Sequence, residues 1–375
     1  MGRLETIYRL GIKELYSLRH DRVLLILVIW AFSFSIYTAA TGMSHDLNRA
    51  AIAIVDEDRS QLSNRIREAL LPPYFEEPAL ISFDEIDSGM DSGRYTFVLV
   101  VPSGFEADVL AGRRPAIQVN IDATAMMQAG IGDRYIAGIL TQEIATFAGA
   151  GMEGPPAAVA LETRYAFNPN ITGAWFTSIM EMINNITILA IVLTGAALIR
   201  EREHGTIEHL LVMPVTPLEI MLAKVWANAL VIMVATALCL GLVVETLLQV
   251  PVAGSKTLFL LGTALYLFFA TALGIFLATL ARSMPQFGLL FMLVILPMNL
   301  LSGSDTPIES QPELLQLVMQ TVPSTHFVSF AQAILYRGAG IDVVWPQFLL
   351  VTAIGGLFFT FAAARFRSSV GALRS

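Results

Sequence analysis

The sequence predicts an α-helical polytopic membrane protein with six transmembrane helices and an inserted α/β extracytoplasmic domain. Three observations predict this fold. Apolar residues make up 55% of the 375 residues and charged residues only 14%, whereas soluble domains contain about 25% charged residues. Six apolar runs reach or approach the length that a bilayer requires. One long interval between the first two runs is rich in charge and alternates strand-like with helix-like segments.

The apolar runs predict transmembrane helices because each is long and almost free of charged residues. The second run contains one acid, Glu181, and the third has Lys224 near one end. The fifth contains Pro297 and is expected to be broken or tilted. The predicted spans are 23–41, 175–199, 220–244, 257–281, 287–303 and 343–364.

The distribution of basic residues predicts that both termini are cytoplasmic. The segments assigned to the inside hold 12 Lys and Arg against seven acids, whereas the outside segments hold 11 basic residues and 23 acids. These inside segments are 1–22, 200–224, 282–286 and 365–375.

The first inside segment, residues 1–22, predicts an amphipathic cytoplasmic helix. Ile7, Leu10, Leu15 and Leu18 fall near one helical face, with the basic residues elsewhere. We expect this helix to lie on the inner leaflet of the membrane.

Residues 42–174 have the composition of a separate extracytoplasmic domain. They carry nine Arg and 18 Asp or Glu, but no Lys or Cys. Alternating short strands and helices in this interval predict a small α/β sheet domain. The expected strands are 51–55, 80–83, 95–101, 116–121 and 162–167, and one long helix is expected over 123–150. Residues 175–375 then form a membrane domain with the second to sixth transmembrane helices and a cytoplasmic loop at 200–219.

The sequence predicts no catalytic, cofactor-binding or metal site. The lysines follow Ile, Ala and Ser, so the Gly-Lys of a phosphate-binding loop is missing. The single cysteine, Cys239, excludes a disulfide framework, and the formal charge of −8 argues against nucleic-acid binding. The acids at 56–58 follow a strand, and such a run is typical of a turn and a helix start rather than of a metal site.

The loop between the second and third spans predicts a short amphipathic helix at the membrane surface. Gly205 frees the backbone to turn, Thr206 is a suitable N-cap, and Pro214 ends the helix. Ile207, Leu210 and Leu211 share one apolar face, which packs either on lipid or in a groove of another protein. The loop reads Arg200-Glu201-Arg202-Glu203-His204-Gly205-Thr206-Ile207-Glu208-His209-Leu210-Leu211-Val212-Met213-Pro214.

This loop resembles the signature of ABC-2 transporter permease subunits, in particular the drug-exporter-like subgroup with a large extracytoplasmic domain after the first span. Shorter matching phrases lie at 281–286, 323–327 and 333–338, and the resemblance covers the whole chain. It implies that the loop docks on a nucleotide-binding subunit. The residues that match this ATPase-coupling motif are Glu201, Arg202, Glu203, Gly205, Thr206, Glu208, Leu210, Leu211 and Pro214.

The resemblance further implies a permease subunit that forms the pathway of an ATP-binding-cassette exporter as a homodimer. A separate ATPase subunit would use the ATP, so the chain itself would be no enzyme and would bind no cofactor directly. The implied location is the bacterial inner membrane, with efflux as the activity and a membrane-fusion adaptor at the extracytoplasmic domain. The alternative is a non-transporting transmitter that moves its extracytoplasmic domain to regulate a partner.

Polar residues within the second span leave two interpretations open. Glu181, Asn184 and Asn185 lie at helical spacing. Intramembrane acids usually face a bundle interior or a wet cavity, which would place these residues on the substrate pathway or at the homodimer seam. Alternatively, Glu181 is solvated near the interface and the two asparagines join helices to each other.

Overall fold

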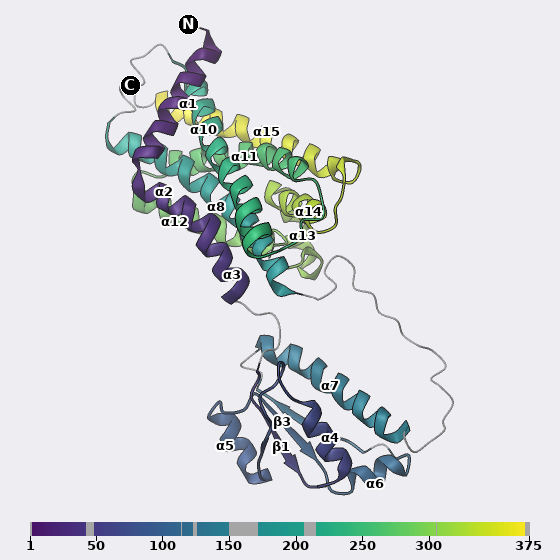
Figure 1. Ribbon diagram of the computed structural model, residues 1–375. Helices are drawn as coiled ribbons and strands as arrows, with labels where there is room; N and C mark the ends of the chain where they lie inside the picture. Colours follow the sequence, from purple (N-terminus) through teal and green to yellow (C-terminus); the bar gives the residue numbers. More distant parts are fainter. Residues whose placement is uncertain are drawn as a thin grey trace. The chain divides into compact units, whose positions relative to one another are not determined.

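The computed structural model describes residues 2–42, 49–113, 115–122, 126–149, 172–205, 215–304 and 306–371. The chain divides into two compact units, one formed by Met1–Gly42 with Ala174–Ser375 and the other by Met43–Gly173. The first is a bundle of helices and the second a sheet covered by helices (Figure 1). We refer to them as the membrane unit and the sheet unit.

Among the described residues, six helices of the membrane unit are long and apolar enough to cross a membrane, and this confirms the expected fold class. The first span consists of α2 (Arg22–Trp30), a π-helical turn η1 (Ala31–Ser35) and α3 (Ile36–Gly42). The third consists of α10 (Pro217–Leu238) and a second π-helical segment, η3 (Cys239–Leu247). The others are α8 (Gly173–Glu203), α11 (Lys256–Leu280), α12 (Met284–Leu301) and α15 (Ile341–Gly371).

The core of the membrane unit forms around α8, α11 and the short helix α14 (Pro323–Leu335). Tyr266 of α11 stacks on Phe327 of α14 with ring centroids 4.0 Å apart, and its hydroxyl hydrogen-bonds Thr187 of α8 at 2.9 Å. Because α14 is buried among these helices, its backbone is covered by protein. Two further short elements precede it, η4 (Ile308–Ser310) and α13 (Glu313–Met319).

The fifth span, expected to be broken or tilted at Pro297, is not broken. Helix α12 continues through Pro297 to Leu301. A proline lacks the backbone N–H and so removes one hydrogen bond from the helix. Transmembrane helices tolerate this loss because neighbouring helices, Ser or Thr side chains, water or a local change of helical geometry satisfy the freed backbone group. Pro297 therefore does not divide the span.

The amphipathic N-terminal segment forms α1 (Arg3–His20), which lies against α10. Leu10 and Leu18 pack on the core of the membrane unit, whereas Leu4 and Tyr16 are exposed. The apolar face of α1 is therefore used in part to contact another helix of the same chain.

The sheet unit contains, within its described residues, four strands in the order β2-β1-β3-β4. The central strands β1 and β3 are parallel, with Ile52 opposite Phe97, and β4 is antiparallel to β3. β3 is buried throughout, as its continuous apolar sequence predicts. Helices α4, α6 and α7 cover one face and α5 the other (Figure 1). The bounds are β1 (Ile52–Asp56), α4 (Gln61–Ala69), β2 (Ala79–Leu80), η2 (Phe83–Glu85), α5 (Ile86–Asp91), β3 (Phe97–Val101), α6 (Phe105–Leu110), β4 (Gln118–Ile121) and α7 (Met126–Gly149).

The second strand and the acids that follow β1 can be compared with the sequence predictions. The second strand is shorter than expected because Ser82 and Glu85 form a capping box that starts a helical turn. The carboxylates of Asp56 and Asp58 accept backbone hydrogen bonds from Arg59 and Glu106, at 2.8 and 3.0 Å. The acids after β1 thus order a turn and a helix start. The strand expected at 162–167 lies outside the described residues.

Candidate functional site

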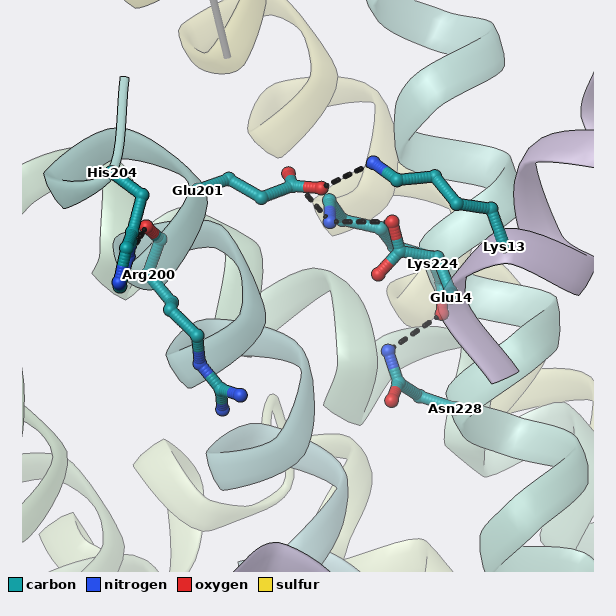
Figure 2. A network of polar contacts seen from close by, with 7 residues as sticks. All are labelled: Lys13, Glu14, Arg200, Glu201, His204, Lys224 and Asn228. Carbon is teal, nitrogen blue, oxygen red and sulfur yellow. Dashed lines mark hydrogen bonds and ion pairs between the residues drawn. The ribbon is translucent and has the colours of Figure 1, made fainter. Parts of the chain in front are cut away.

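A network of charged side chains joins α1, α8 and α10 in the membrane unit (Figure 2). The ammonium of Lys224 lies 3.0 Å from Glu14 Oε1 and 2.7 Å from Glu201 Oε2. Lys13 donates a hydrogen bond of 3.2 Å to Glu201 Oε1. The side chain of Lys224 is only 1% exposed, and those of Glu14 and Glu201 are 12% and 13% exposed. We call Lys13, Glu14, Glu201 and Lys224 the charge cluster.

Charge balance explains why the charge cluster tolerates burial. Two ammonium groups face two carboxylates, so each charge removed from water gains an opposite partner. Burial raises the pKa of Glu14 above its ordinary value and the Glu201 carboxylate raises it further, although Lys224 opposes both effects. Removing the ammonium of Lys224 would leave the buried Glu14 carboxylate without its ion-pair partner and would leave Glu201 with the half-exposed Lys13 as its remaining ion pair in the charge cluster.

The C-terminal end of α8 supplies one member of this cluster and three further contacts. Successive residues of an α-helix point about 100° apart, so the side chains of 200–203 leave the helix in different directions. Arg200 forms an ion pair with Asp21, which lies between α1 and α2. Figure 2 shows the side chain of Arg200 pointing away from the charge cluster. The alternation of charge therefore serves contacts on different sides of the helix.

The other two residues of this run reach the connection between α11 and α12. Arg202 donates a hydrogen bond of 2.6 Å to the backbone oxygen of Ala281, at the C-terminal end of α11. Glu203 accepts one of 2.9 Å from the backbone nitrogen of Met284, the first residue of α12. Both backbone groups belong to helix ends, where partners within the helix are missing. The end of α8 is thus bonded to α1, α10, α11 and α12.

Close packing between α1 and α10 supports the charge cluster. Gly11 lies against Trp226, and a Cβ atom at Gly11 would come within 2.1 Å of the indole ring. The indole nitrogen donates a hydrogen bond of 3.2 Å to the backbone oxygen of Ile7, and Tyr8 stacks on the ring with centroids 5.9 Å apart. A glycine at this position therefore allows the two helices to approach.

The residues of the predicted coupling motif are only partly described. Glu201, Arg202 and Glu203 lie at the end of α8, and Gly205 adopts a positive φ of 68°, which favours glycine. The chain is described again from Val215, and Thr216 caps α10 through a capping box with Glu219. The other predicted motif residues lie outside the described residues: Thr206, Glu208, Leu210, Leu211 and Pro214.

The polar residues predicted in the second span contact the first span of the same chain. Asn185 donates a hydrogen bond of 2.9 Å to the backbone oxygen of Ala31, the first residue of the π-helical turn η1. Ser35, the last residue of that turn, donates one of 2.9 Å to Glu181. Asn184 is also buried. These bonds give Glu181 and Asn185 a helix-joining role, and the pathway or seam role of Glu181, Asn184 and Asn185 stays a prediction.

We expect Glu181→Leu to lower the free energy of unfolding by about 1–3 kcal/mol, because the half-buried Ser35 hydroxyl loses its acceptor. Glu181→Gln keeps an acceptor and is expected to cost less than about 1 kcal/mol. Thermal unfolding of the purified protein measures both values. A pathway role would instead be indicated if Glu181→Gln changed transport while the melting temperature and the amount of assembled protein stayed normal.

Sequence reasoning missed Lys13, Glu14 and Lys224 as site residues. One signal was present, because Lys224 is a lone charge inside the third apolar run and a buried lysine requires an acidic partner. Its partners were not identifiable from spacing, since Lys224 and Glu14 are separated by 210 positions.

Within the described residues, six candidate spans and a sheet unit inserted after the first give the architecture of a multi-pass membrane protein. The family model described as ABC-2 family transporter protein matches residues 23–365. The chain therefore belongs to the ABC-2 family of transporters.

Curated relatives agree with this membership over essentially the whole chain. The chain is 55% identical over 373 residues to the inner membrane transport permease YhhJ of Escherichia coli K12, with 100% of both chains covered. It is 28% identical to the probable multidrug ABC transporter permease YbhR of the same organism, covering 98% of this chain and 99% of YbhR. Identity to the probable multidrug ABC transporter permease YbhS is 26%, covering 84% of each chain. The protein is thus a multi-pass permease of the inner membrane.

Proposed function

We propose that this chain is the membrane subunit of an ATP-driven exporter, that two copies form the translocation pathway, and that a separate ATPase subunit powers it. The proposal is supported by the contacts of Glu201, Arg202 and Glu203, the first residues of the predicted coupling motif, which bond the end of α8 to four other helices. The names of YbhR and YbhS, probable multidrug ABC transporter permeases, support drugs as the class of cargo.

The contacts at the end of α8 provide a route for coupling. A force applied to the loop at 206–214 reaches α8 directly, because the loop follows this helix in the chain. The charge cluster then carries the displacement to α1 and α10, while Arg202 and Glu203 carry it to the junction of α11 and α12. Chains of ion pairs and hydrogen bonds between packed helices, such as these, can carry energetic coupling between distant sites.

The orientation follows from the positive-inside rule, which places both termini and the coupling loop in the cytoplasm with the ATPase. The sheet unit then lies outside the cytoplasm. Residues 42–174, which include this unit, hold 18 acids and nine arginines and so have a net negative charge. An extracytoplasmic module of this size is a natural docking site for a membrane-fusion adaptor.

The experiment that tests this proposal introduces a charge at Leu210 or Leu211, on the apolar face of the helix that the sequence predicts for this loop. Leu210→Asp or Leu211→Asp is expected to abolish co-purification of the ATPase subunit and ATP-dependent movement of cargo in reconstituted vesicles. A charge on a buried interface commonly removes several kcal/mol of binding free energy. His209→Asp, one position away on the same loop, is the matched control.

Unchanged complex formation and unchanged transport in both leucine variants would contradict the proposal. An intact complex that hydrolyses ATP, displaces the sheet unit and moves no cargo would favour the transmitter instead.

A further inference from the structure

A cavity of about 370 Å³ opens among the first, second and fifth spans, next to the end of α8 but apart from the charge cluster. This volume lies within the range of about 300–1,000 Å³ that ligand pockets occupy. The walls are apolar except at one end, where Asp21 and Arg200 lie. The apolar side chains come from α2, α8 and α12: Val23, Leu24, Val192, Ala196, Phe287 and Phe291.

The polar end of the cavity carries one fixed charge of each sign. Asp21 accepts a hydrogen bond of 3.1 Å from the backbone nitrogen of Leu24 and forms an ion pair with Arg200. Burial raises the pKa of Asp21, but the backbone hydrogen bonds from Leu24 and Val23 and the charge and hydrogen bond of Arg200 outweigh it, so the net pKa lies below the ordinary value. The carboxylate is therefore ionised at neutral pH.

Arg200 retains capacity to bind a second anion. A guanidinium has five N–H donors, and within the described part of the chain the only side chain that accepts from Arg200 is Asp21. The Arg200 side chain is 34% exposed. Guanidinium groups bind phosphate oxygens well, often through two parallel hydrogen bonds. The carboxylate of Asp21 accepts from Arg200 and from the backbone of Leu24 and Val23, fewer bonds than its roughly four acceptor sites allow.

The apolar cavity and the ion pair at its end together indicate which head group and which chain a ligand must have. A purely anionic head group would meet the Asp21 carboxylate, and a purely cationic one would meet Arg200. A head group with both a phosphate and an ammonium satisfies both residues, while an alkyl chain fills the apolar part. Asp21 and Arg200 also lie at the ends of two spans, at the level where lipid head groups are expected.

We propose that this cavity binds one amphiphile with an aminophosphate head group, of the phosphatidylethanolamine type. Arg200 contacts the phosphate, Asp21 contacts the ammonium, and one acyl chain lies between α2, α8 and α12. The bound amphiphile is either a resident membrane lipid or a transported molecule with the same head-group chemistry.

The test uses the purified full-length chain, offered equal amounts of phosphatidylethanolamine and phosphatidylglycerol, with bound lipid counted by native mass spectrometry. We expect the wild type to retain one phosphatidylethanolamine per chain, at least about tenfold more often than phosphatidylglycerol, a ratio that corresponds to about 1.4 kcal/mol. Arg200→Gln should remove this preference, whereas Arg9→Gln, which alters an exposed ion pair, should retain it.

A second variant tests the cavity without changing any charge. Gly288 lines the cavity and its added Cβ would meet no atom within 4 Å, so Gly288→Trp is expected to fill the space without disturbing the fold. It should lose the retained lipid. Gly356→Trp, at a glycine of α15 with equally open surroundings, should bind lipid like the wild type. Equal retention of both lipids by the wild type, or normal retention by a folded Gly288→Trp, would overturn the proposal.

A third arm distinguishes the two sources of the ligand and rests on the proposed exporter function. In vesicles that also contain the ATPase subunit, loss of the bound phosphatidylethanolamine during ATP turnover identifies it as cargo, and retention identifies it as a resident lipid. Because the binding experiment needs neither ATP nor the ATPase, failure of the site and failure of the exporter function give different results.

Discussion

Replacing Lys224 by Met is expected to lower the free energy of unfolding by about 3–5 kcal/mol, because Glu14 and Glu201 then remain buried without the ammonium between them. The matched control is Lys256→Met, which breaks an ion pair with Glu245 whose lysine is 51% exposed. Exposed pairs contribute about 0–1 kcal/mol. Denaturant or thermal unfolding of both purified variants measures the difference.

The same variant should show a defined dependence on pH. Without Lys224, the pKa of Glu14, already raised by burial, rises further because its main opposing charge is gone. A carboxyl group with a higher pKa in the folded than in the unfolded state binds protons preferentially when folded, so its contribution to stability is present at low pH and lost as pH rises. The loss of unfolding free energy caused by Lys224→Met, relative to the wild type, should therefore be smaller at about pH 5 than at about pH 8. If Lys224→Met lost no more unfolding free energy than Lys256→Met at both pH values, Lys224 would not be the buried counter-ion of Glu14 and Glu201.

Gly11→Leu should separate α1 from α10. Its Cβ atom alone would overlap the ring of Trp226, and forced overpacking costs about 1–3 kcal/mol. Displacement of α1 would also weaken the bond from Glu14 to Lys224, which adds to the loss of stability. The melting temperature of the purified protein and the protease sensitivity of the N-terminal segment are the measurements.

Two further variants test whether the loss of stability comes from the clash with Trp226. Gly138→Leu, in α7, adds the same side chain to a helix where the new Cβ meets no atom within 4 Å, and it should leave stability nearly unchanged. Gly11→Leu combined with Trp226→Ala should recover part of the loss by making room for the leucine. A melting temperature of Gly11→Leu equal to that of the wild type would mean that α1 is not held against α10 as described.

Much of the fold could be predicted from the sequence because hydropathy and strand patterns are local. Each apolar run became a span within a few residues, and the continuous apolar sequence of β3 correctly predicted burial on both faces. Errors arose where a local signal competes with its surroundings. Pro297 predicted a broken or tilted span, whereas the helix continues unbroken through it. The residues after Leu80 were expected to extend a strand, although Ser82 starts a helical turn.

The site was less predictable because its members are brought together only by packing. The run 200–203 was recognised as part of a motif, but the direction of each side chain depends on which helices surround the end of α8. Lys13 is separated from Glu201 by 188 positions, and no spacing rule connects them. The need for a glycine at position 11 likewise could not be predicted from the sequence, because it depends on the contact with Trp226 of another helix.

The central claim is that the charge cluster joins the coupling motif to α10 as one bonded unit, and a double-mutant cycle on Lys224 and Glu201 tests it most directly. The free energy of unfolding is measured for Lys224→Met, Glu201→Gln, the double variant and the wild type. Residues in one ion network show interaction energies of about 0.5–3 kcal/mol, whereas independent sites add within about 0.3–0.5 kcal/mol. We predict an interaction energy above about 1 kcal/mol, with the double variant less destabilised than the sum of the single variants. Additive effects would contradict the claim that Lys224 and Glu201 act together.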